Sequence, residues 1–161
     1  MKKTKAKIVA YDPEIYPVYL YVGTVECLNE ANKLFDGYDT MQDASNDQNP
    51  GDIVVSNDNV DGVTVCVREK KTGAVGLLVL INTKLAKETV SEVVPHESVH
   101  VADGIFDYLG IVKSNYEAGN EHYAYLVGWV AGRISNYLIN YTNKENNNGT
   151  DNEIWRISIE I

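Results

Sequence analysis

The stretch Val75-Gly76-Leu77-Leu78-Val79-Leu80-Ile81 is an almost unbroken run of apolar residues. A strand with one solvated face alternates apolar and polar residues, whereas a strand covered on both faces is apolar throughout. We therefore predict that this strand lies at the centre of a sheet. The preceding strand-like stretch, Gly62–Glu69, is joined to residues 74–82 by Lys70-Lys71-Thr72-Gly73, which predicts a β-hairpin.

Further elements are expected on the N-terminal side of this hairpin. Residues 7–12 and 16–22 are rich in Val, Ile and Tyr, which predicts two strands around a turn at Asp12-Pro13. Thr24 is a candidate N-cap for a helix that continues through Phe35. Residues 53–56 predict one more short strand.

On the C-terminal side, two long helices are expected over residues 84–109 and 115–142, the second with a capping box at Ser114-Asn115-Tyr116-Glu117. Residues 143–152 contain five Asn and no apolar side chain, which predicts a flexible linker before a terminal strand that ends at Ile161. Together these elements predict one α+β domain over residues 1–161, with a small mixed or antiparallel sheet packed on two helices.

The composition is typical of a soluble globular protein and excludes two classes of partner. The 161 residues carry 14 Lys plus Arg against 23 Asp plus Glu, a net charge of -9. Arg occurs only at positions 68, 133 and 156, so the chain has no cluster of cations for nucleic acid or an anionic membrane. It has no apolar run near the ~20 residues of a membrane span. The apolar stretch after the basic start is too short for a signal peptide, so we expect a cytoplasmic protein.

Two kinds of metal site are excluded. Cys27 and Cys66 are the only cysteines and have no thiolate metal spacing, so both are expected to be small buried side chains. The segment 36–61 has seven Asp and no Lys or Arg, and Asn57-x-Asn59-x-Asp61-Gly62 resembles the start of an EF-hand loop. Because the twelfth position, which needs a bidentate Glu, is Arg68, a solvated loop is predicted instead.

The candidate active site lies in Val93-Val94-Pro95-His96-Glu97-Ser98-Val99-His100-Val101, which contains H-E-x-x-H within a predicted helix. Residues four apart share a helix face, so His96 and His100 present two imidazole nitrogens to one point, as a tetrahedral zinc ion requires. Glu97 is turned about 100° from His96 and can reach a zinc-bound water without ligating the ion. Pro95 lacks an N–H, so the helix is expected to kink there or to begin near it.

A zinc ion held by two His needs a third protein ligand, and the sequence offers three candidates. Asp103 and Asp107 follow His100 in a pattern that resembles the metzincin H-E-x-x-H-x-x-G-x-x-H/D motif shifted by one residue. That interpretation fails, because the Gly is displaced and no Met follows to form the Met turn. The third candidate, Glu121, lies on the next helix. Small side chains on its face are expected to let the two helices approach closely and to bring Glu121 to the ion; they are Ala124, Gly128 and Gly132.

With Asn120-Glu121-His122-Tyr123-Ala124-Tyr125 on this second helix, the chain resembles the gluzincin group of zincin metallopeptidases. Short phage-encoded and bacterial zincin-like proteins look similar. The resemblance covers residues 93–132. It implies a minimal zincin-like fold and one zinc ion bound by His96, His100 and Glu121, with Glu97 as the general base.

Two side chains are candidates to support the ligands. Thermolysin-like proteins carry an Asp four residues after their Glu ligand, where this chain has Tyr125. Asp103 shares a face with both histidines. It is expected either to replace that Asp as the hydrogen-bond partner of a ligand imidazole or to be a solvated helix charge. No residue stands out to stabilise the oxyanion, because in a chain with 11 Tyr the nearby side chains are expected to be packing residues: Tyr116, His122, Tyr123 and Tyr125.

The sequence therefore predicts a zinc-dependent peptidase that acts on a peptide or protein substrate. In zincins an edge strand commonly holds the substrate in extended form by main-chain hydrogen bonds, and we expect Gly62–Glu69 to be that strand. The alternative is a non-catalytic zincin-fold module that keeps the metal and binds a protein partner. The small size of the chain and the departure at Tyr125 favour this alternative. The sequence predicts no oligomeric state.

Overall fold

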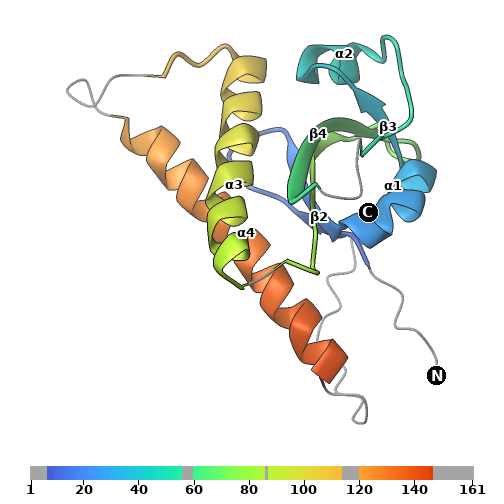
Figure 1. The fold of residues 1–161 in the computed structure, drawn as a ribbon. Helices are drawn as coiled ribbons and strands as arrows, with labels where there is room; N and C mark the ends of the chain where they lie inside the picture. Colours follow the sequence, from blue (N-terminus) through green and yellow to red (C-terminus); the bar gives the residue numbers. More distant parts are fainter. Residues whose placement is uncertain (1–6, 56–59, 86, 114–119, 147–161) are drawn as a thin grey trace.

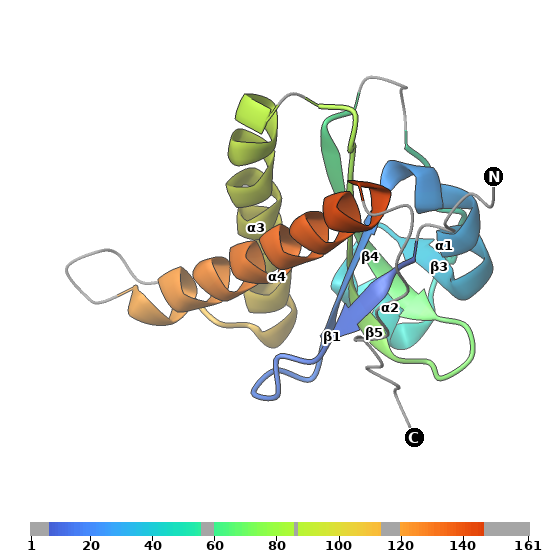
Figure 2. The same cartoon turned by 90° about the horizontal axis from the view of Figure 1, so that it is seen from below.

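A computed structural model of the chain describes residues 7–55, 60–85, 87–113 and 120–146 and has an α+β architecture. Helices α3 and α4 cross one another on one face of a five-stranded mixed sheet, and α1 lies on the other face (Figures 1 and 2). In chain order the elements are β1 (Val9–Tyr11), β2 (Tyr19–Thr24), the 3-10 turn η1 (Val25–Cys27), α1 (Leu28–Leu34), β3 (Phe35–Tyr38), α2 (Met41–Asn46), β4 (Gly62–Glu69), β5 (Val75–Ile81), α3 (Lys87–Leu109) and α4 (Glu121–Asn146).

Strand β5 lies at the centre of the sheet, which confirms the prediction from its apolar sequence. The strand order is β1-β2-β5-β4-β3, and β5 pairs parallel with β2 and antiparallel with β4. Leu78 and Leu80 are buried on one face of β5, whereas Leu77, Val79 and Ile81 are buried on the other. The antiparallel β4–β5 pair also confirms the predicted hairpin.

A hydrophobic core lies on each face of the sheet, and the larger core determines the position of α3. On that face α3 and α4 bury four large aliphatic side chains against the sheet, namely Val101, Ile105, Val130 and Ile134. Burying one such side chain contributes about 1.5–3 kcal/mol, so the position of α3 over the sheet is strongly specified. Ala31 and Cys27 belong to the smaller core on the opposite face, with Phe35.

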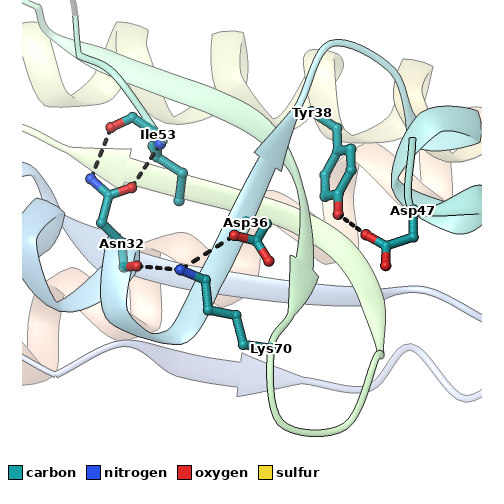
Figure 3. Close-up of polar contacts among 6 residues, drawn as sticks. All are labelled: Asn32, Asp36, Tyr38, Asp47, Ile53 and Lys70. Carbon is teal, nitrogen blue, oxygen red and sulfur yellow. Dashed lines mark hydrogen bonds and ion pairs between the residues drawn. The ribbon is translucent and has the colours of Figure 1, made fainter. Parts of the chain in front are cut away.

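The segment 36–61 was expected to be a solvated loop, but it contains part of β3 and all of α2. Thr40 caps α2 by accepting a hydrogen bond from the Asp43 N–H at 3.0 Å. Tyr38 donates to Asp47 at 2.6 Å (Figure 3). Arg68, which excludes an EF-hand, ties the end of α2 to the sheet by donating to the carbonyls of Ala44 and Ser45.

The strand predicted over residues 53–56 is not formed in its described part, 53–55. The Asn32 side chain takes the place of a partner strand, because its amide donates to the Ile53 carbonyl at 3.0 Å and accepts from the Ile53 N–H at 2.7 Å (Figure 3). Lys70 fixes the same region: it donates to the Asn32 carbonyl at 2.8 Å and lies 3.3 Å from the Asp36 carboxylate. Ile53 is thus buried without belonging to the sheet.

Several element boundaries differ from those predicted. Thr24 makes no side-chain capping bond, because β2 runs through it and the turn η1 precedes α1. Helix α3 does not begin near Pro95, but starts at Lys87 and continues through the proline. Helix α4 extends to Asn146, so the first part of the predicted linker 143–152 is helical. The predicted capping box at 114–117 and the predicted terminal strand lie outside the described residues. None of the described helices is long and apolar enough to cross a lipid bilayer.

Both cysteines are free, and only one is fully buried. Cys27 is buried as predicted, whereas Cys66 is partly buried. Burial raises the pKa of the Cys66 thiol to about 11, with further contributions from the charges of Asp39 and Asp43. The thiolate is the reactive form of cysteine, so this raised pKa disfavours reaction of Cys66 near neutral pH.

The small face of α4 does not pack against α3, which contradicts the prediction. Ala124, Gly128 and Gly132 are exposed, and a Cβ built at either glycine meets no atom within 4 Å. The face that packs is the one with the large apolar side chains, because they remove more apolar area from water. It carries Leu126, Val130, Ile134 and Tyr137.

Gly132→Ala is expected to stabilise the protein by about 0.5–1 kcal/mol, because Ala restricts the unfolded chain and favours the helix interior. Urea denaturation would measure the change. The matched control is Gly104→Ala in α3, where the new Cβ would lie 3.1 Å from Leu77 Cδ2 and no gain is expected. A loss of stability in Gly132→Ala would mean that this face of α4 is packed in solution.

Candidate functional site

His96 and His100 come together on the exposed side of α3, as the i, i+4 spacing predicts. Their Nε2 atoms are 3.1 Å apart and their ring planes are inclined by 79°. Two nitrogens at ~2.0–2.1 Å from a tetrahedral zinc ion lie about 3.3 Å apart. The separation of the two Nε2 atoms is therefore close to the one that a shared metal ion needs.

Glu97 faces the sheet rather than solvent. Its side chain is only 4% exposed, and its Oε2 accepts a hydrogen bond from the Thr64 hydroxyl at 2.6 Å. Gly62 on the same strand allows this approach, because a Cβ there would lie 2.8 Å from Val93 Cγ1 and 3.0 Å from Glu97 Cγ. Neither Thr64 nor Gly62 was singled out from the sequence as a neighbour of Glu97. Nothing local in the sequence indicates which strand residues lie under the helix.

Asp103 lies one helix turn beyond His100, and its hydrogen bonds go to other elements. It accepts from Tyr123 in α4 at 2.5 Å and from Lys113 at 2.8 Å. Burial acts to raise the pKa of Asp103, but the hydrogen bonds from Lys113 and Tyr123 and the charges of Lys113 and His100 outweigh it and hold the pKa below its usual value. Asp103 is thus neither bonded to an imidazole nor a freely solvated charge. It connects α3 to the start of α4.

Tyr123 is committed to this connection. Its ring packs edge-on against Phe106 at a centroid distance of 5.3 Å. Burial raises the pKa of Tyr123, and the hydrogen bond to Asp103 and the charges of Asp103 and Asp107 add to that effect. Its hydroxyl proton is therefore held by Asp103. Tyr125, the other candidate to support the ligands, is 74% exposed.

The structure does not bring Glu121 into one group with the two histidines. Glu121 is the first residue of α4 and is exposed. Over residues 7–55, 60–85, 87–113 and 120–146, no three His, Cys, Asp or Glu side chains lie close enough to hold a metal ion. Asp103 and Asp107 likewise form no metal-binding group with the two histidines. The site thus has two converging nitrogen donors and a buried carboxylate, without a third gathered ligand.

Strand β4 is an edge strand over only half its length, which corrects the prediction for Gly62–Glu69. Strand β3 pairs with residues 66–69 and leaves 62–65 without a described partner on that side. Asp61 accepts from the Asn82 N–H, so alternate residues from Asp61 onward bond to β5. The main-chain groups of Gly62 and Thr64 therefore point to the free edge. Both residues also lie beside the Glu97 side chain.

A scan of the sequence against models of known protein families gave no match, and searches among curated proteins and among solved structures found no similar chain.

Proposed function

We propose that the chain is a zinc-dependent peptidase whose active centre lies between α3 and the free edge of β4. The observation that carries this proposal is the convergence of the His96 and His100 Nε2 atoms at 3.1 Å, on the helix turn that also carries Glu97. Two neutral imidazoles beside a carboxylate base are the groups that H-E-x-x-H peptidases use. The free main-chain groups of Gly62 and Thr64 offer a place for an extended peptide.

In this proposal one zinc ion is bound by His96, His100 and Glu121. The separation of the two histidine nitrogens suits the ion, whereas Glu121 has to approach them. The first turn of α4 is already close to α3, since Tyr123 donates to Asp103, one helix turn beyond His100. The proposal therefore requires this turn of α4 to move toward His100 when zinc binds.

Different residues of the chain would have different roles in hydrolysis. When bound, zinc lowers the pKa of a coordinated water toward ~7 and polarises a carbonyl oxygen. Glu97 accepts a proton from the attacking water and delivers it to the leaving amine. The main chain at Gly62 and Thr64 holds the substrate beside Glu97. We assign no described side chain to the oxyanion.

Metal analysis of the purified protein tests the proposal first. We expect about one equivalent of zinc in the native protein, and cleavage of a broad peptide library that a chelator abolishes and added zinc restores. His100→Ala and Glu121→Ala should each lose the zinc, while the matched control Asp107→Ala should retain it. Less than about a tenth of an equivalent in the native protein would exclude a zinc site.

A non-catalytic zincin-fold module is the second candidate. The observation in its favour is the departure at Tyr125, which stands where thermolysin-like proteins carry an Asp and is 74% exposed. It predicts bound metal with no cleavage of any peptide in the library. The proposed peptidase predicts cleavage that requires both zinc and Glu97.

A further inference from the structure

The hydroxyl of Thr64 makes a hydrogen bond that orients a buried carboxylate next to the free strand edge. Its Oγ1 donates to Glu97 Oε2 at 2.6 Å across 33 positions of the sequence, from β4 to α3. Glu97 is only 4% exposed, so water has little access to replace this bond. We infer that Thr64 is a positioning residue, which holds Glu97 in the orientation that general-base catalysis needs; this inference rests on the proposed peptidase function.

The two carboxylate oxygens of Glu97 have different neighbours. Oε2 is fixed by Thr64, whereas Oε1 lies 3.1 Å from the position that a Cβ on Gly62 would occupy. Oε1 therefore lies over Gly62, a residue of the free edge where the substrate main chain is proposed to bind. A carboxylate with one oxygen fixed in this way has fewer rotamers to lose when it accepts a proton from water at the other oxygen.

Thr64 also links substrate binding to the base. Its N–H and C=O point to the free edge, while its side chain points to Glu97 on the α3 side of the sheet. A peptide that pairs with the main chain of Thr64 therefore binds to the residue that orients the base. Hence the side chain is expected to govern the chemical step, and the main chain to govern binding.

The first test compares Thr64→Val with Thr64→Ser on the full-length zinc-loaded protein. Val matches the shape of Thr but cannot donate, so kcat is expected to fall about 100-fold with KM within about twofold of wild type. Ser keeps the hydroxyl and should restore kcat to within about threefold. Thr72→Val is the matched control, because Thr72 makes the same kind of bond to Glu69 at the far end of β4, and its kcat should not change. All rates are taken per folded, zinc-containing molecule.

The second readout needs no activity. Thr64→Val is expected to lower the melting temperature of the metal-free protein by about 5 °C, because Glu97 Oε2 loses its partner. In the Glu97→Ala background the same change should lower it by less than about 2 °C.

Wild-type kcat in Thr64→Val, or a melting shift that is equal in the two backgrounds, would overturn the inference. If the native protein cleaves no peptide at all, the proposed function fails and the positioning role fails with it. The melting cycle then still reports whether the bond between Thr64 and Glu97 exists, which separates the two failures.

Discussion

Glu97→Gln is expected to lower kcat/KM for peptide cleavage at least about 100-fold while leaving one equivalent of zinc bound. Gln has the shape of Glu, and its amide oxygen can still accept the hydrogen bond from Thr64. The amide, however, has no basic oxygen that can take a proton from water near neutral pH. Initial rates on a fluorogenic peptide, with zinc content measured on the same samples, would check both expectations.

The matched control for this change is Glu92→Gln, an exposed glutamate on the same helix. It alters the charge near the site by the same amount and should leave the rate unchanged. Equal activity in Glu97→Gln and the native protein would contradict the assignment of Glu97 as the base. Loss of zinc in Glu97→Gln would instead point to Glu97 as a ligand.

Gly76→Ala is expected to reduce the free energy of unfolding by more than about 4 kcal/mol. The new Cβ would lie 2.5 Å from the Tyr19 carbonyl oxygen and 2.6 Å from Tyr21 Cε2. The ring can rotate away, but the carbonyl belongs to β2, which pairs with β5 along its whole length. Relief of the clash therefore requires the central strands to separate. Most domains have only about 5–15 kcal/mol of stability, so much of the protein would unfold.

Urea denaturation followed by far-UV circular dichroism would measure the loss. Gly51→Ala is the control, because a Cβ at Gly51 meets nothing within 4 Å. A Gly76→Ala protein with the native midpoint would mean that β2 and β5 are not paired in the register Tyr19 to Gly76.

The centre of the fold could be predicted because its signal is local. An apolar run such as Val75–Ile81 requires cover on both faces, and the structure supplies it. The elements in 36–61 could not be predicted, since their stability comes from distant partners. Asn32 holds Ile53 from 21 positions away, and Arg68 anchors α2 from the sheet. A short segment rich in Asp gives no periodicity from which such contacts can be inferred.

The candidate site also combines a local sequence signal with a contact between residues that are distant in the sequence. The pairing of His96 with His100 follows from helix geometry alone and was predicted. The contact between Thr64 and Glu97 depends on how a hairpin packs under a helix, which the sequence does not encode locally. The small face of α4 was misjudged because small side chains can mark either close packing or exposure. Here the large side chains around Val130 decided which face is buried.

The half-free edge of β4 has a consequence for how the protein behaves at high concentration. Unpaired strand edges recruit further copies of a chain and so promote aggregation. In the described part of the β4 edge, Gly62 and Thr64 point main-chain groups outward, which allows four hydrogen bonds at about 0.5–1.5 kcal/mol each. Association costs an estimated ~4–15 kcal/mol, so a second copy gains too little there to remain attached. The shortness that limits polymerisation through this edge would also favour rapid release of a cleaved product from the proposed peptidase.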